Sequence, residues 1–235
     1  YVVRVTDETI LLELEPEAER LLNRHLSSAE EWYPHEQVPW DRAARLNSEG
    51  FTFGEEPLPQ GVRSALLVNL LTEDNLPYYF RDIDRLFGSD TAFGAWARNW
   101  TAEEGRHSIV MRDYFTVTRA VDPVQLERAR MIQVRSGQVP APHDAFEALS
   151  YVSMQELATR ISHRNTGKLS DDPIAESMMQ RVALDENLHM LFYRNTLSAA
   201  LDMEPNAAMR AIADVVTNFD MPGADMPGFA RKSVG

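Results

Sequence analysis

The sequence of 235 residues contains no cysteine. This absence excludes disulfide bonds, thiolate zinc sites and cysteine nucleophiles, so any bound metal must be held by histidine, aspartate or glutamate. Basic residues are also few, since 23 Lys and Arg stand against 36 Asp and Glu, which gives a net charge of −13. Nucleic-acid binding needs clustered basic side chains, so we expect no nucleic-acid partner.

Long hydrophobic runs are missing as well. No apolar stretch approaches the roughly 18 residues of a membrane-spanning helix, so we expect a protein that is not integral to a membrane. No targeting segment is visible, and we expect a cytoplasmic location. Hydrophobic residues make up 44% of the chain and charged residues 25%, which is typical of a globular protein.

What the sequence does contain is a series of helical patterns. Val, Ile and Thr rarely alternate with polar residues, and neither Asn-Gly nor Asp-Gly occurs as a hairpin signal. We expect one all-α domain over residues 1–235, and we expect Pro77 to kink the second of its helices. The expected helices cover approximately residues 7–26, 62–86, 89–120, 123–137, 145–165, 171–201 and 206–219.

Two of the six histidines follow a glutamate by three positions, in Glu104-Gly-Arg-His107 and in Glu186-Asn-Leu-His189. Residues three apart share one face of a helix, so each pair can point at one position in space. Either pair taken alone is equally well explained as a salt bridge on a helix surface. A second acid precedes each pair, however, and both pairs lie in mid-helix among apolar residues, where unpaired carboxylates are costly to bury.

The pattern is also duplicated along the chain, because Glu73 and Glu156 lie about 30 residues before Glu104 and Glu186. This arrangement is typical of ferritin-like bundles, in which two helices contribute one Glu each and two contribute Glu-x-x-His to a dinuclear site. Four carboxylates balance the charge of two divalent cations, which makes their burial reasonable. We therefore expect a four-helix core that houses a dinuclear metal site, with additional peripheral helices.

The same residues resemble the soluble acyl-acyl-carrier-protein desaturase family, most closely its mycobacterial members. The family motif Glu-Glu-Asn-Arg-His-Gly appears as Glu103-Glu-Gly-Arg-His-Ser108, and Asp-Glu-Lys-Arg-His-Glu appears as Asp185-Glu-Asn-Leu-His-Met190. The stretches 72–78 and 151–166 are similar to the segments that carry the remaining metal ligands. The similarity runs from about Leu21 to Met226.

The resemblance implies an O₂-dependent oxidoreductase of fatty acid biosynthesis. Such an enzyme introduces a cis double bond into a saturated acyl chain on acyl-carrier protein. It implies two ferrous ions, which manganese can replace, together with a ferredoxin-like electron donor and a homodimer. The implied metal ligands are Glu73, Glu104, His107, Glu156, Glu186 and His189, with Glu104 and Glu186 as the bridges.

Three further residues receive catalytic roles from the resemblance. Asp185 would bind a ligating imidazole, that of His107, and continue to Trp32 as an electron route. Thr159 would manage protons on the oxygen-binding side, although a helix threonine that bonds a preceding carbonyl is an equally good interpretation. A desaturase also needs an apolar tunnel, for which Ala148 and Leu149 are candidates.

Other polar and aromatic residues are given no chemical role. Trp96 and Trp100 are interpreted as core packing, and His163 is expected to be structural or exposed. His25, His35 and His143 lie in boundary segments without a motif.

The chain departs from the family pattern at Asn187 and Leu188, which replace a Lys-Arg pair. Arginine beside buried carboxylates steadies their charge, so this loss is expected to weaken metal affinity or redox tuning. Two alternatives therefore stay open. One is a degenerate desaturase that serves as a non-catalytic acyl-carrier-protein binder or partner subunit. The other is a ferritin-like di-iron oxidase or metal-storage protein without an acyl tunnel.

Overall fold

The computed structural model describes residues 7–43, 58–137, 139 and 142–221. Within these residues the chain forms helices and no strand, which confirms the all-α prediction. The helices are α1 (Asp7–Ser28), α2 (Pro34–Gln37), α4 (Gln60–Glu73), α5 (Leu76–Phe87), α6 (Ala92–Thr118), α7 (Pro123–Ser136), α8 (Ala145–Lys168), α9 (Pro173–Met203) and α10 (Pro205–Asn218).

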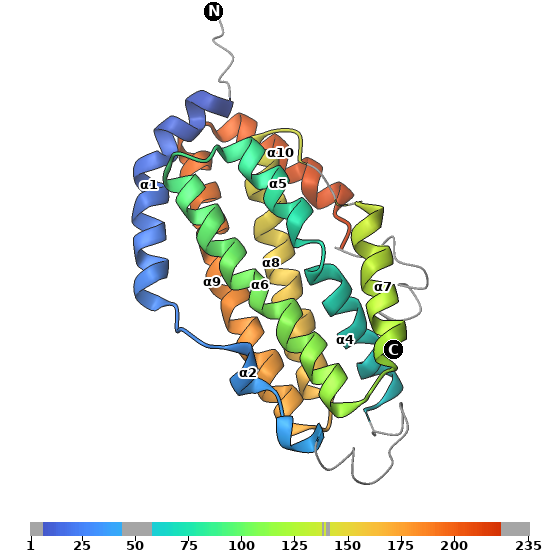
Figure 1. The fold of residues 1–235 in the computed structure, drawn as a ribbon. Helices are drawn as coiled ribbons and strands as arrows, with labels where there is room; N and C mark the ends of the chain where they lie inside the picture. Colours follow the sequence, from blue (N-terminus) through green and yellow to red (C-terminus); the bar gives the residue numbers. More distant parts are fainter. Residues whose placement is uncertain (1–6, 44–57, 138, 140–141, 222–235) are drawn as a thin grey trace, which may run out of the picture.

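Helices α4, α6, α8 and α9 pack against one another and form the four-helix core (Figure 1). Helix α1 lies against α6 and α9, α5 continues from α4 against α6 and α8, and α10 covers one end of α8 and α9. Helix α7 contacts α4 at the periphery. This is the expected ferritin-like arrangement, with a core of four helices and further helices around it.

The starts of three long helices are set by aspartate caps. The side chains of Asp122, Asp144 and Asp172 accept hydrogen bonds from backbone N–H groups in the first turns of α7, α8 and α9. Proline follows immediately in α7 and α9, where its missing N–H costs no helical hydrogen bond. The expected helix starts at residues 123 and 145 are confirmed, and the helix expected from about residue 171 begins at Pro173.

The single kinked helix expected over residues 62–86 is wrong, because the chain divides there into α4 and α5. Pro77 has no N–H to bond the Glu73 carbonyl and its ring would clash with that carbonyl, so α4 cannot continue and Pro77 lies in the first turn of a new helix. The Asp74 side chain at the break is fixed by Arg130 of α7, whose Nε and Nη2 donate at 2.7 and 2.8 Å. The break leaves Glu73 as the last residue of α4.

The apolar core is divided into two clusters along the bundle. In α6, Phe93 and Trp100 belong to one cluster, whereas Val110 and Phe115 belong to the other. Helix α9 is divided in the same way, with residues 175–182 in one cluster and residues 192–200 in the other. The segments between the clusters carry buried polar side chains, and these form the candidate site.

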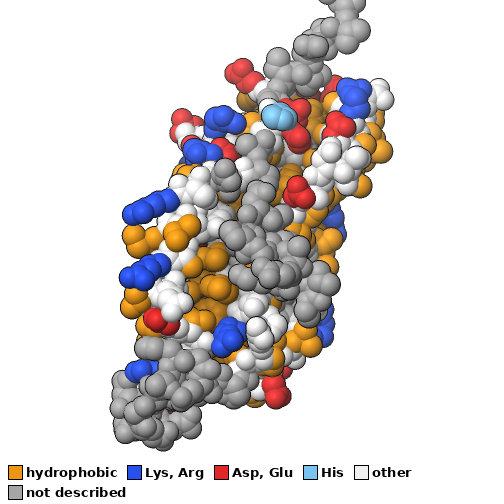
Figure 2. All heavy atoms as spheres, turned by 90° about the vertical axis from the view of Figure 1, so that its right-hand side faces the viewer, with side chains coloured by type: hydrophobic (Ala, Val, Ile, Leu, Met, Phe, Trp, Pro, Cys, Tyr) orange, Lys and Arg blue, Asp and Glu red, His pale blue; other side chains and the backbone are white. Residues whose placement is uncertain are grey.

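The surface gives less information about function. On the face in Figure 2, acidic and basic side chains are interspersed among hydrophobic ones. Helix α7 exposes several apolar side chains, among them Val124, Met131 and Ile132. No helix in the described ranges has the length and apolar character needed to cross a membrane.

Candidate metal centre

Six side chains converge between the two apolar clusters, and they come from all four core helices. Helix α4 contributes Glu73, α6 contributes Glu104 and His107, α8 contributes Glu156, and α9 contributes Glu186 and His189. All six residues are buried, with exposed fractions between 0 and 7%. The i, i+3 spacing in α6 and α9 places each glutamate and its histidine on the same inward face, as the sequence predicted.

The six residues form two overlapping groups. Glu73, Glu104, His107 and Glu186 form one group, and Glu104, Glu156, Glu186 and His189 form the other. Within each group, one candidate ligand atom from every member lies within 4.8 Å of the others. Glu104 and Glu186 belong to both groups, which is the placement that bridging carboxylates require.

Both imidazoles present Nδ1 to the centre of the cluster. His107 Nδ1 lies 3.3 Å from Glu104 Oε2 and 3.7 Å from Glu73 Oε2. His189 Nδ1 lies 2.8 Å from Glu104 Oε1 and 3.7 Å from Glu156 Oε2. Each Nε2 atom consequently points away from the centre, toward a second layer of side chains.

The donor set fits a pair of metal ions. Glu104 Oε1, His107 Nδ1, Glu156 Oε2 and His189 Nδ1 are buried and make no well-oriented hydrogen bond within the described residues, although Glu104 Oε1 and His189 Nδ1 lie only 2.8 Å apart. Unpartnered polar atoms are rare in protein interiors, and four of them belong to candidate ligands in this one cluster. Carboxylate oxygens and imidazole nitrogens suit first-row divalent ions, and four carboxylates neutralise two of them.

Without metal, the cluster must hold protons. Burial and the charge of Glu186 raise the pKa of Glu156 well above its ordinary value of 4.5. Burial lowers the pKa of His107 and His189, but the surrounding carboxylates outweigh it and raise both pKa values well above 6.5. A metal ion would displace these protons, so metal affinity should depend on pH.

Asp185 lies behind His107. Its Oδ2 atom is 3.4 Å from His107 Nε2 and accepts hydrogen bonds from Trp32 Nε1 at 2.8 Å and from Arg106 Nη2 at 2.9 Å. Arg181 donates to Oδ1 at 2.7 Å. Burial alone would raise the pKa of Asp185, but His107 and Arg181 hold it well below its ordinary range. The contacts of Trp32 and Asp185 match those the resemblance implies, whereas their electron-transfer role stays a prediction.

Glu103 lies behind His189 in the corresponding position. Its Oε2 atom is 2.8 Å from His189 Nε2 and 2.9 Å from His25 Nε2. Burial would raise the pKa of Glu103, but the bonds with His189 and His25 lower it to about 2. His25 has no sequence motif, because a contact between α1 and α6 leaves no local spacing signal.

Helix α8 contributes two further polar side chains. Thr159 Oγ1 lies 3.1 Å from Glu186 Oε2, and it also contacts the carbonyls of Gln155 and Glu156 at 3.1 and 3.2 Å. Both interpretations of Thr159 are therefore compatible with its geometry. His163 is buried, not exposed, and its Nε2 atom lies 3.1 Å from Glu73 Oε1 and 3.2 Å from Glu186 Oε1.

His163 could have been found from the sequence, because Glu156, Thr159 and His163 recur at the spacing of one helix face. Trp100 does more than pack in the core. Trp100 is buried in the core, but its Nε1 atom also donates to Glu156 Oε1 at 3.0 Å.

A small cleft with a cavity volume of about 20 Å³ lies between α5 and α8. Trp100 and Gln155, which contact or adjoin Glu156, lie on its wall. Ala148 lines the cleft as expected, whereas Leu149 is buried in the core beside it. The remaining lining residues are Tyr79, Asp82, Ile83, Leu86, Pro142, Tyr151 and Val152.

Comparison with known proteins agrees with this geometry. The family model described as fatty acid desaturase matches residues 6–234. The Mycobacterium tuberculosis protein named "Putative acyl-(acyl-carrier-protein) desaturase DesA1" is 46% identical over 98% of this chain and 72% of its own length. The Arabidopsis thaliana protein named stearoyl-(acyl-carrier-protein) 9-desaturase 6, chloroplastic, is 34% identical over 68% of this chain and 44% of its own length.

A solved structure shares the fold. The X-ray structure of the M. tuberculosis protein titled putative acyl-ACP desaturase DesA2 superposes with a TM-score of 0.76 at 30% sequence identity. The superposition covers 95% of this chain and 83% of that one. Sequence and structure thus lead to the same assignment, and the chain belongs to the fatty acid desaturase family, a family of oxidoreductases.

Proposed function

We propose that this protein is an O₂-dependent di-iron desaturase that introduces a cis double bond into a saturated acyl chain carried on acyl-carrier protein. The observation that carries the proposal is the pair of overlapping four-residue groups that share Glu104 and Glu186. The relatives support the substrate class, because their names specify acyl-carrier-protein substrates.

In this proposal Glu73 and His107 would hold one iron and Glu156 and His189 the other, and Glu104 and Glu186, which belong to both groups, would serve both ions. When bound, the irons supply the O₂-derived oxidant that an unactivated methylene pair requires and that no side chain can provide. The overall reaction joins CH₂–CH₂, O₂, two electrons and two protons to give CH=CH and two waters. Manganese would be accepted by the same oxygen and nitrogen donors.

The protein's own side chains position the centre and deliver charge to it. Asp185 orients the His107 ring and connects it to Trp32, whose indole N–H it binds. This connection is the proposed route for electrons from a ferredoxin-like donor. Thr159 Oγ1 can donate a proton toward the bridging carboxylate Glu186, from which it lies 3.1 Å away.

The cleft beside Glu156 is the proposed binding site of the acyl chain. Mostly apolar side chains line it, and its cavity volume of about 20 Å³ means that the walls must move apart to admit the chain. Bound there, the chain would exclude water from the oxidising centre and hold a methylene pair beside it. The same cleft favours a desaturase over a ferritin-like oxidase or storage protein, which needs no such space.

The homodimer is proposed from the family relation. The cytoplasmic location and the single domain over residues 1–235 are proposed from the sequence, which shows no targeting segment and a continuous series of helical patterns. The departure at Leu188 keeps one rival in consideration, a non-catalytic protein that binds acyl-carrier protein.

Metal analysis combined with product analysis tests the proposal. The protein is reconstituted with ferrous iron and supplied with ferredoxin, a reductant, O₂ and saturated acyl-carrier proteins of several chain lengths. We expect two irons per chain and an unsaturated product. Two irons without product at any length would support the binding-protein alternative, and O₂ consumption that is independent of the acyl substrate would support the oxidase.

A further inference from the structure

The environments of the two inward-facing histidines are built alike. The carboxylate behind His107 is Asp185, and the carboxylate behind His189 is Glu103. Asp185 immediately precedes Glu186 on α9, and Glu103 immediately precedes Glu104 on α6. Each motif therefore supplies the carboxylate that contacts the histidine of the other motif, and such carboxylate–histidine pairs occur at many metal sites.

Each carboxylate is also held by an aromatic N–H from the N-terminal part of the chain. Trp32 Nε1 donates to Asp185 at 2.8 Å, and His25 Nε2 lies 2.9 Å from Glu103 Oε2. The rings stack in the same way, with Trp32 at 6.4 Å and 11° from His107 and His25 at 5.9 Å and 27° from His189.

The two sides differ at the residue before each histidine. Arg106 donates to Asp185 at 2.9 Å, and its Cζ atom lies 4.9 Å from the centroid of the Trp32 ring. The corresponding residue in the second motif is Leu188, which cannot donate a hydrogen bond. Within the described ranges, the hydrogen bonds to the Glu103 carboxylate come from histidine rings alone.

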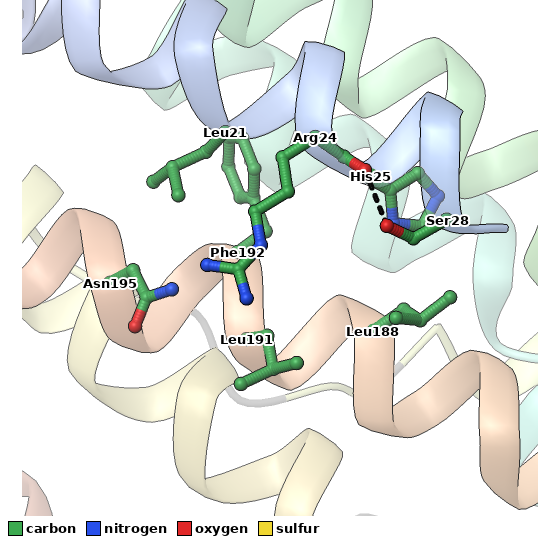
Figure 3. A pocket seen from close by; sticks show the side chains of 8 residues that line it. All are labelled: Leu21, Arg24, His25, Ser28, Leu188, Leu191, Phe192 and Asn195. Atoms are coloured by element: carbon green, nitrogen blue, oxygen red, sulfur yellow. Dashed lines mark hydrogen bonds between the residues drawn. The ribbon is translucent and has the colours of Figure 1, made fainter.

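Leu188 and His25 line the same cleft between α9 and α1, whose cavity volume is about 70 Å³ (Figure 3). The His25 side chain is only 3% exposed, and Trp96 packs edge-on against it at 4.9 Å. Its Nδ1 atom has no hydrogen-bond partner among the described residues. Among the described residues, Glu103 is therefore the only hydrogen-bond partner of the His25 ring, and Nε2–H is the donor.

We propose that His25 is a positioning residue of the metal centre. His25 holds Glu103, and Glu103 in turn orients His189. At Glu103, His25 takes over the role that Arg106 plays at Asp185. The inference rests on the proposed metal centre. In the metal-bound form, His189 would offer Nδ1 to the ion and donate Nε2–H to Glu103. His25 then supplies the second N–H that keeps this carboxylate fixed and ionised.

Cobalt binding to the metal-free full-length protein tests the proposal without reference to activity. Titration with Co²⁺ gives stoichiometry and affinity, and visible spectra of His107→Ala and His189→Ala identify the two sites. His25→Leu removes the donor, and His25→Gln retains an N–H of similar reach. The double variant His25→Leu/Leu188→Arg offers a guanidinium to Glu103 from the opposite wall. His143→Leu, at an exposed histidine, is the matched control.

We expect His25→Leu to weaken the His189 site about 10- to 100-fold and to leave the His107 site within about twofold. His25→Gln and the double variant should recover most of this loss, while His143→Leu should bind like wild type. Equal binding by His25→Leu and wild type would overturn the proposal, as would rescue by neither variant. Equal weakening of both sites with a lower apo melting temperature would indicate a merely structural role. If wild type itself fails to bind two ions, the proposed function fails as well.

Discussion

Replacing Glu156 by Gln is expected to stabilise the metal-free protein while impairing its metal site. Burial and the charge of Glu186 raise the pKa of Glu156 well above 4.5, so folding near neutral pH forces this carboxyl to take up a proton. Because the folded-state pKa is the higher one, the stability contributed by Glu156 is fully present below pH 4.5. It is lost as the pH rises through the folded-state pKa.

The largest possible gain in the free energy of unfolding follows from the pH and from the ordinary pKa of the carboxyl. Protonating at pH 7 a carboxyl whose ordinary pKa is 4.5 costs at most about 3.4 kcal/mol, because pH and pKa differ by 2.5 units at 1.36 kcal/mol per unit. Glutamine resembles the protonated form without this cost, and its Oε1 atom can still accept the bond from Trp100 Nε1. The gain should therefore approach about 3.4 kcal/mol at pH 7 and nearly vanish at pH 4.5.

Urea unfolding of chelator-treated protein between pH 4.5 and 7 measures this gain, and Co²⁺ titration measures the loss of one of two ions. Glu19→Gln, at an exposed position in the middle of α1, is the control and should change stability by no more than about 0.5 kcal/mol. Destabilisation by Glu156→Gln at pH 7, or a gain that does not depend on pH, would refute the reasoning.

Three further predictions concern the bridge, a buried histidine and the cleft. Glu186→Ala should keep its helical circular dichroism but bind fewer than two metal ions per chain, and two ions would show that Glu186 does not bridge. Burial lowers the pKa of His163, but Glu186 and Glu73 raise it to about 9. The stability it contributes to the metal-free protein, on the order of 3 kcal/mol, is therefore complete below pH 6.5 and lost as the pH rises through 9. Unfolding of His163→Gln should lack this slope, and an unchanged slope would contradict the assignment. Ala148→Trp should abolish acyl-chain conversion and retain two metal ions, whereas full activity would place the chain elsewhere.

Much of the fold and the inner layer of the site could be predicted from the sequence, because their signals are local and repeated. The spacing of Glu104 and His107, and of Glu186 and His189, depends only on helix geometry. The aspartate caps mark where α7, α8 and α9 begin. The division between α4 and α5 was missed because Pro77 can either kink a helix or start a new one, and packing decides between them.

The second layer was less predictable, because it is built from contacts between distant segments. Asp185 and Trp32 were placed by resemblance, but His25 has no motif and meets Glu103 only through the packing of α1 against α6 and α9. His163 shares a helix face with Glu156, yet one helix face alone does not say whether it is buried. The concern about Leu188 stays a prediction, and the structure places this residue on the wall of the cleft that His25 also lines.

A single-turnover experiment tests the central claim most directly. The protein is loaded anaerobically with ferrous iron, reduced, mixed with a saturated acyl-acyl-carrier protein and exposed to O₂, and the released acyl chain is examined by mass spectrometry. The account predicts an acyl chain that has lost two hydrogens, with a cis double bond at one position. An unaltered acyl chain at every length tested, in protein that holds two irons per chain, would contradict it.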